Sequence, residues 1–229
     1  DLWNTANGAS ALYSNTTGIV NTAIGDHTLF SNITGGYNSA NGASALYNNT
    51  TGGANTANGA FALFTNSSGR ENTANGVNAL YYNTTGGGNT ANGAFALLTN
   101  TTGSSNTANG ANALFYNTDG WYNTATGVYS LYNNTTGRYN TANGVEALYS
   151  NTTGNYNIAI GPNSLQSNTS GSYNIAIGFN AMYSNYYATG NVAIGIRAAS
   201  ANDSTGNASA NHNTAIGYEA LRVNNDGGN

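Results

Sequence analysis

The residues best suited to acid-base or metal chemistry are few and are widely separated along the chain. His27 follows Asp26, and His212 lies near the other end, so the two histidines lack the spacing of a shared metal ion. The sequence has no cysteine, which excludes disulfides, thiolate metal sites and cysteine nucleophiles. These observations predict that the protein is not an enzyme and that it holds no metal or cofactor.

The acidic and basic residues do not indicate a charged partner either. Asp203, Glu219 and Asp226 are close in sequence but form no Asp-x-Asp calcium loop, so isolated surface residues are the preferred interpretation. Four arginines, no lysine and eight acidic residues provide no basic surface for nucleic acid. No apolar run approaches the roughly 20 residues that span a bilayer. We therefore expect neither nucleic-acid binding nor membrane insertion, and the composition is typical of an extracellular or cell-surface structural protein.

A more informative group of residues recurs every 17 positions. Aromatic residues form one such column, and a second aromatic column includes Tyr37 and Tyr122. If the rings pack on one another they stiffen the structure, and if they are exposed they provide a stripe for stacking on the sugar rings of a polysaccharide. A regular row of threonines, such as Thr56 and Thr73, fits β-structure and is also the kind of surface that ice-binding solenoids use. The first aromatic column includes Tyr13, Tyr47, Tyr81, Tyr132 and Tyr149.

These columns exist because one 17-residue phrase repeats along nearly the whole chain. With Asn4 as its first residue, twelve phrases start in one register, the last of them at Asn191. That phrase carries five extra residues, and the next begins at Asn213. We therefore expect one array over 1–229, with regular coils over 4–190, a longer coil over 191–212 and a last coil over 213–229.

Each phrase predicts one coil of β-structure. The Asn109-Gly110 pair permits positive φ and marks one corner, and the sequence Asn-Thr-Thr-Gly at Asn83 to Gly86 marks a second. Between the corners lie two short extended segments, which read Tyr-Asn-Thr-Ala and Ala-Leu-Tyr. The predicted fold is all-β, a parallel β-solenoid (β-roll) with 17 residues per coil and about 13 coils, in which two facing sheets enclose a thin core.

Identical residues in successive coils should stack into ladders along the solenoid. Asparagine suits such stacking because its amide donates to one neighbouring coil and accepts from the other. Alanine and leucine columns would form the core, and glycine would stay at the corner. The residues expected in these structural columns are Asn106, Asn117, Ala108, Leu80, Leu97, Leu114 and Gly110.

Some phrases resemble repeats of known surface proteins. The sequences NTAIG at Asn21 to Gly25, NIAIG at Asn157 to Gly161 and NVAIG at Asn191 to Gly195 resemble the head repeats of trimeric autotransporter adhesins. The longer phrase, NTANGxxALYSNTTG, is similar to repeats in bacterial and phage tail-fibre-like proteins. This resemblance implies a parallel β-roll that is presented outside the cell and used for adhesion or as a fibre shaft.

Three consecutive phrases carry aliphatic residues where threonine and asparagine usually stand. Strand alternation places these side chains on the face opposite the invariant alanine. Two interpretations remain open, a locally larger core or an assembly surface covered by another subunit. The residues are Ile158, Ile160, Ile175, Ile177, Val192 and Ile194.

The ends of the array suggest how the protein assembles. A parallel solenoid exposes unpaired strand edges at its first and last coils. The last phrase keeps the register of the first, since Asn213 and Ala215 match Asn4 and Ala6. We expect a homopolymer that grows head to tail into a filament with a surface, biofilm or adhesion role. The alternative is an adhesin or binding module that recognises polysaccharide through the tyrosine stripe, or ice through the threonine row.

Overall fold

The computed structural model of the protein describes residues 2–203, 205–206 and 210–224. The chain divides into two compact units, Asp1–Asp119 and Gly120–Asn229. Both units are parallel β-solenoids with one strand of the main sheet per coil, usually of 17 residues, and the described residues contain about 13 coils and no helix. The predicted fold class is therefore confirmed, while the organisation as a single array stays a prediction.

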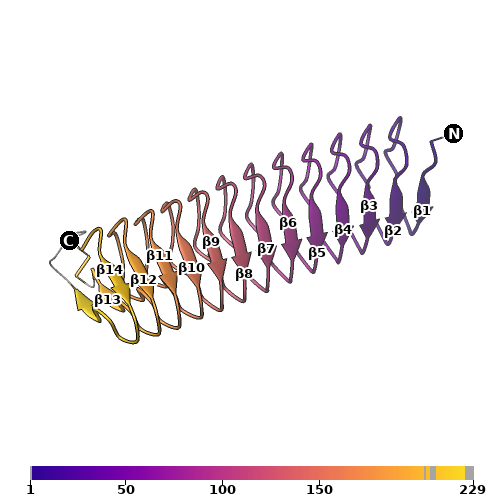
Figure 1. Ribbon diagram of the computed structural model, residues 1–229. Helices are drawn as coiled ribbons and strands as arrows, with labels where there is room; N and C mark the ends of the chain where they lie inside the picture. Colours follow the sequence, from indigo (N-terminus) through magenta and orange to yellow (C-terminus); the bar gives the residue numbers. More distant parts are fainter. Residues whose placement is uncertain (1, 204, 207–209, 225–229) are drawn as a thin grey trace. The chain divides into compact units, whose positions relative to one another are not determined.

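The first unit contains one three-residue strand in each of seven coils (Figure 1). Successive strands pair in parallel and in register, so that Ala57 lies beside Ala74 and Ala74 beside Ala91. These strands are β1 (Thr5–Asn7), β2 (Thr22–Ile24), β3 (Ser39–Asn41), β4 (Thr56–Asn58), β5 (Thr73–Asn75), β6 (Thr90–Asn92) and β7 (Thr107–Asn109).

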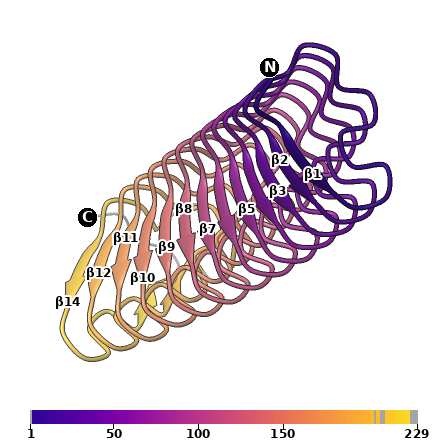
Figure 2. The ribbon, with the colours of Figure 1, turned by 90° about the vertical axis from the view of Figure 1, so that its right-hand side faces the viewer.

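The second unit continues the same pattern within itself, and Figure 2 shows its coils following one another. Across the longer coil the register step becomes 22 residues, because Val192 pairs with Thr214. A separate two-stranded ladder joins β13 (Ala201–Asn202) to β15 (Val223–Asn224). The main strands are β8 (Thr124–Thr126), β9 (Thr141–Asn143), β10 (Ile158–Ile160), β11 (Ile175–Ile177), β12 (Val192–Ile194) and β14 (Thr214–Ile216).

The expectation of a second facing sheet is wrong. The Ala-Leu-Tyr segment does not form a strand, because the residues on either side of its alanine position adopt left-handed backbone angles, as His27 (φ 53°) and Leu29 (φ 53°) do. A left-handed L-residue costs about 1–2 kcal/mol. Hydrogen bonds to both neighbouring coils offset this cost: the His27 N–H donates to the Ala9 carbonyl (2.8 Å), and the Leu29 N–H donates to the Ala45 carbonyl (3.0 Å).

The turned segment directs leucine inward against the strand alanines, and these two columns form the core. Ala108, Leu80, Leu97 and Leu114 are completely buried. Gly110 has a φ of 143° at the corner, and its carbonyl oxygen lies only 2.6 Å from where a Cβ on Gly93 would stand. A side chain at this corner would therefore collide with the backbone of the next coil.

Two buried asparagine columns hold each coil to the next and confirm the predicted ladder. In the first column, the backbone N–H and Nδ2 of Asn72 donate to Oδ1 of Asn55 at 3.0 and 3.2 Å. Nδ2 of Asn72 also donates to the carbonyl of Gly86 (2.9 Å). Asn106 makes the same backbone and side-chain bonds to Asn89.

The second column meets the first at one carbonyl group. Nδ2 of Asn83 donates to Oδ1 of Asn66 (2.8 Å) and to the carbonyl of Gly86 (3.0 Å). Asn117 continues this column by donating to Oδ1 of Asn100 (2.7 Å). A Cβ on Gly86 would overlap the carbonyl oxygen of Gly103 and Oδ1 of Asn83. The glycine of Asn-Thr-Thr-Gly is thus required by close approach between coils.

The ladder predicts that inner asparagines contribute much more to the free energy of unfolding than outer asparagines do. Replacing Asn72 by Ala leaves the backbone N–H and Nδ2 of Asn89 without their acceptor, and it removes one donor from the Gly86 carbonyl. We expect a loss of roughly 2–4 kcal/mol in the free energy of unfolding, measured by urea denaturation. The outer Asn75, which donates to Asn92 (2.7 Å) and accepts from Asn58 (2.8 Å) on the solvent-facing side of the strand, is the control, and its change to Ala should cost less than about 1 kcal/mol. Equal losses for the two variants would contradict a buried ladder.

Candidate interaction surfaces

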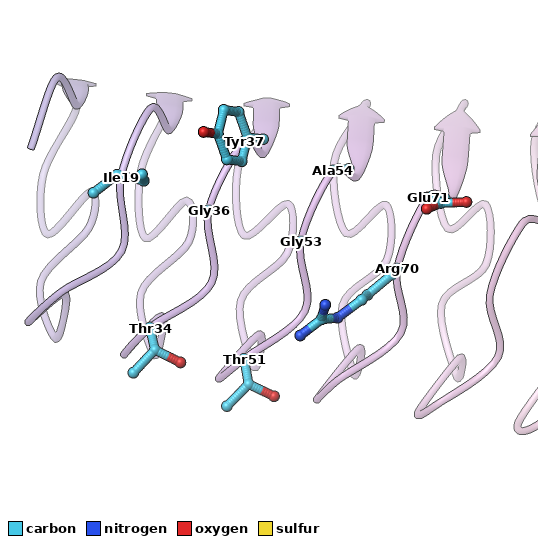
Figure 3. Close-up of a pocket in the computed structure, with 9 residues that line it drawn as sticks. All are labelled: Ile19, Thr34, Gly36, Tyr37, Thr51, Gly53, Ala54, Arg70 and Glu71. Atoms are coloured by element: carbon cyan, nitrogen blue, oxygen red, sulfur yellow. The ribbon is translucent and has the colours of Figure 1, made fainter.

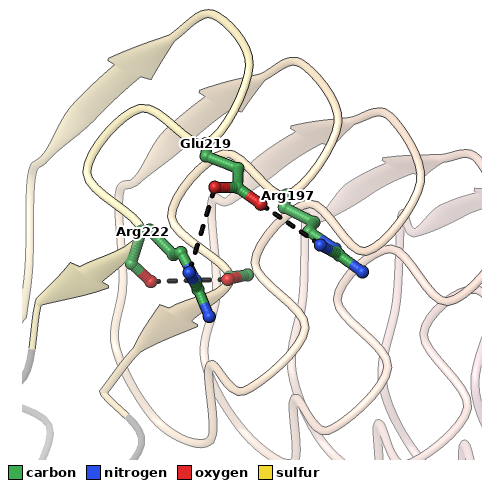
Figure 4. A network of polar contacts seen from close by, with 4 residues as sticks. Arg197, Glu219 and Arg222 are labelled. Atoms are coloured by element: carbon green, nitrogen blue, oxygen red, sulfur yellow. Dashed lines mark hydrogen bonds and ion pairs between the residues drawn. The ribbon is translucent and has the colours of Figure 1, made fainter.

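Five titratable residues, Asp26, His27, Arg197, Glu219 and Arg222, form ion pairs on the surface, and in the described ranges no group of three or more His, Cys, Asp or Glu side chains could hold a metal ion. His27 contacts the adjacent Asp26 at 2.8 Å. Glu219 bridges Arg197 (3.2 Å) and Arg222 (3.9 Å) between the last two coils of the second unit (Figure 4). Exposed pairs of this kind contribute little to stability.

The carboxylates considered for calcium are not brought together. Asp203 is buried and its Oδ2 accepts a hydrogen bond from the backbone N–H of Tyr187 (3.0 Å), whereas Glu219 is engaged by arginines. Asp226 lies outside the described residues. The expectations that the protein is not an enzyme and holds no metal or cofactor stay predictions. Within the described ranges there is also no helix with the length and apolar character needed to cross a membrane.

The first aromatic column consists of stacked rings, although Leu98 and Gln166 interrupt it. In the first unit the stack begins at Tyr13 and Phe30, whose centroids are 5.2 Å apart at an interplanar angle of 4°. It runs on through Tyr47 and Phe64 to Tyr81, with centroids 5.0–5.2 Å apart. In the second unit Tyr132 stacks on Tyr149 in the same way (5.2 Å, 6°). The ring faces that a sugar would need are occupied by neighbouring rings, which favours the structural interpretation of this stripe.

The second aromatic column is complete over four coils of the second unit. Tyr122, Tyr139, Tyr156 and Tyr173 stack with centroids 4.8–5.2 Å apart. Partial desolvation raises the pKa of Tyr139 above the usual tyrosine value, and the neighbouring Tyr156 and Tyr122 add to this shift. Beside the stack, the Arg138 guanidinium lies 4.7 Å from the ring centroid of Trp121. This column also serves mainly to bind coil to coil.

The aliphatic side chains of β10, β11 and β12 lie on the outer face of the sheet. Ile158, Ile160 and Ile194 are 37–39% exposed, and Ile175, Ile177 and Val192 are half-buried between their neighbours. Ala159, Ala176 and Ala193, on the opposite face of the same strands, are completely buried. Of the two open interpretations, the structure supports an apolar surface and not an enlarged core. Its role in assembly stays a prediction.

The outer face of β4 to β7 is polar and regular instead. Threonines such as Thr56, Thr73 and Thr90 lie in register on it. The adjoining asparagines bond to one another in series, with Nδ2 of Asn58 donating to Oδ1 of Asn75 (2.8 Å). Recognition of ice by this face stays a prediction.

A groove that the sequence did not reveal crosses four coils of the first unit (Figure 3). It has a volume of about 310 Å³ and lies where the second aromatic column is interrupted. The only sequence signal was the change from large residues to glycine and alanine at two adjacent columns. Residues lining it include Gly36, Tyr37, Gly53, Ala54, Arg70 and Glu71.

No protein-family model matches the chain, and a search of curated proteins gave no significant match. The solenoid architecture agrees with the resemblance to β-roll repeats. Kinship with autotransporter adhesins or tail fibres stays a prediction.

The exposure of the isoleucines can be tested by replacing them with the residues that occupy the same positions in a neighbouring coil. Strand β9 carries Thr141 and Asn143 where β10 and β11 carry isoleucine. We expect that changing Ile158 and Ile175 to Thr, and Ile160 and Ile177 to Asn, lowers the fluorescence of the apolar dye ANS while the melting temperature changes by only a few degrees. Changing the isolated exposed Val77 and Val145 to Thr is the control and should alter dye binding little. Loss of the folded state in the isoleucine variant would place these side chains in the core.

Proposed function

We propose that the protein is a structural subunit of an extracellular or cell-surface filament, built by head-to-tail stacking of solenoid coils. Hydrogen bonding at the two terminal coils carries this proposal. The resemblance to adhesin and tail-fibre repeats and the nearly uncharged composition support the location and a role in adhesion or biofilm.

The first coil presents backbone groups in a defined pattern. Within the first unit, amides of one coil donate to carbonyls of the preceding coil, as Gly25 does to Asn7 (2.8 Å). The equivalent amides of the first coil, on Gly8 and Ser10, have no acceptor in the part of the chain that is described. Among the described residues, Ala6 is exposed whereas its equivalent in the second coil, Ala23, is buried.

The last coil presents the opposite pattern. In the second unit, other amides donate to the following coil, as Val192 does to Asn213 (2.8 Å) and Ala199 does to Ala220 (2.9 Å). The equivalent amides of Thr214 and Leu221 have no acceptor within 210–224 or the other described residues. Leu221 is 43% exposed, so within the described residues no further coil covers the leucine column on this side.

The N–H and C=O groups at the edge of the first coil match those at the edge of the last coil, donor to acceptor. A last coil placed before the first coil of a second molecule would repeat the bonding seen inside each unit. Such stacking would bury the open alanine and leucine columns and continue both asparagine ladders. The pairs expected at the junction are Gly8 N–H with Ile216 O, Ser10 N–H with Tyr218 O, Thr214 N–H with Asn4 O, and Leu221 N–H with Ala11 O.

A charge in the open core at either end should stop growth in one direction only. The Leu12→Lys variant blocks the first coil and the Leu221→Lys variant blocks the last, because an unpaired ammonium cannot enter the leucine column of a stacked neighbour. We expect each variant alone to sediment as a monomer. An equal mixture should give a discrete dimer, since one intact edge of each variant remains free to pair.

The control is Thr73→Lys, which places the same charge on the outer face of a central coil and should leave polymerisation unchanged. Sedimentation velocity distinguishes these species. Long polymers from Leu12→Lys alone, or a mixture that stays monomeric while the unmodified chain polymerises, would rule out head-to-tail stacking.

A further inference from the structure

The groove of the first unit occupies a missing rung of an aromatic ladder. In the second unit the corresponding column stacks one tyrosine per coil, 4.8–5.2 Å apart. In the first unit Tyr37 is followed one coil later by Ala54 and then by Glu71. Tyr37 is 63% exposed and contacts no aromatic ring among the residues described. One ring face therefore borders a slot about 9.6 Å, or two coil rises, in extent.

The floor of the groove carries backbone N–H groups whose equivalents in other coils have a hydrogen-bond acceptor. In other coils, the amide just before the tyrosine column donates to a side-chain oxygen of the next coil. Gly87 donates in this way to Oγ of Ser104 (3.1 Å), and Asn155 donates to Oγ of Ser172 (3.0 Å). The residues that follow Gly36 and Gly53 in this column are Gly53 and Arg70, which have no such oxygen. The amides of Gly36 and Gly53 accordingly have no acceptor in the described part of the unit.

Charged side chains complete the wall. Arg70 forms no ion pair or hydrogen bond through its side chain with any described residue, whereas Arg197 and Arg222 pair with Glu219. Figure 3 shows its guanidinium extending from its own coil toward Gly53 and Thr51. Glu71 lines the same groove, and its carboxylate likewise has no ion-pair or hydrogen-bond partner in the described part. The groove thus combines an open aromatic face, a row of N–H donors, an available guanidinium and one carboxylate.

We propose that this groove binds a carboxylated pyranose, a uronate unit of an acidic polysaccharide. The apolar face of the sugar ring stacks on Tyr37 in the position of the missing rung. The carboxylate accepts hydrogen bonds from Arg70, which suits planar two-oxygen recognition. The ring oxygen and a hydroxyl oxygen of the sugar accept from the amides of Gly36 and Gly53, and Glu71 accepts from a sugar hydroxyl. The groove offers more hydrogen-bond donors than acceptors, and we therefore expect an anionic sugar rather than a neutral one.

This site goes beyond the structural role and does not depend on filament formation, because all its residues belong to one unit of one chain. The first aromatic column is not involved, since its rings stack on one another from Tyr13 to Tyr81. The two ligand contacts that define the proposal are stacking on Tyr37 and charge recognition by Arg70.

The test is isothermal titration of the full chain with tetragalacturonate and with its methyl ester, which keeps the sugar rings but masks the carboxylates. We expect binding of the acid and at least roughly tenfold weaker binding of the ester. Dextran oligosaccharide is the neutral control. Absence of binding to tetragalacturonate, or equal binding of acid and ester, would overturn the proposal.

Variants locate the site. Ala54→Tyr fills the missing rung with the protein's own ring, and Gly53→Ser supplies the hydroxyl acceptor that Ser104 and Ser172 provide in other coils. Arg70→Gln removes the charge on an exposed side chain, so the fold should be retained. Each change should weaken binding of tetragalacturonate about tenfold or more, whereas Tyr13→Ala, in the other column, should leave it unchanged. Unchanged affinity in the Ala54→Tyr or Arg70→Gln variant would place any binding elsewhere.

Discussion

The solenoid depends on one buried carbonyl group in each coil, which accepts hydrogen bonds from two asparagine side chains. At Gly86 these donors are Asn72 and Asn83, and each of them also bonds to its equivalent in the preceding coil. The coil is thereby closed across its interior and fixed to its neighbour through the same amides. The asparagine amide suits this position because its Nδ2 donates to the preceding coil while its Oδ1 accepts from the following coil.

This arrangement explains which positions of the phrase are constant. The asparagines must stay because a buried amide without its partner is costly, and the glycine must stay because the next coil approaches it too closely for a side chain. Alanine replaces that glycine at Ala210, in the coil that carries the five-residue insertion, and at Ala188, in the coil before it. Because the buried residues determine the fold, the residue types at the outward-facing positions can differ from coil to coil. They vary between threonine rows, isoleucine rows, stacked rings and the groove beside Tyr37.

Much of this interior could be read from the sequence, because a strict period leaves few ways to stack identical residues. The strand around Ala108, the corner at Gly110 and the columns of Asn106, Asn117 and Leu114 all follow from period and turn chemistry. The left-handed residues at Leu29 and its equivalents did not, because intrinsic preference disfavours them and only bonds to adjacent coils stabilise them. The groove was missed in the sequence because no distinctive residue marks it. At its positions a small residue replaces an aromatic ring, and a glycine replaces a residue with a hydroxyl group.

Hydrogen exchange of the asparagine side-chain amides tests the central role of the ladders most directly. In a ¹⁵N-labelled sample of the Leu12→Lys variant, Nδ2 protons of the two buried columns should exchange orders of magnitude more slowly than those of the outer column at Asn58, Asn75 and Asn92. Buried Asn72 and Asn83 would then belong to the slow class and exposed Asn58 to the fast class. Uniformly fast exchange of all asparagine amides, in a chain whose backbone amides remain protected, would contradict the account.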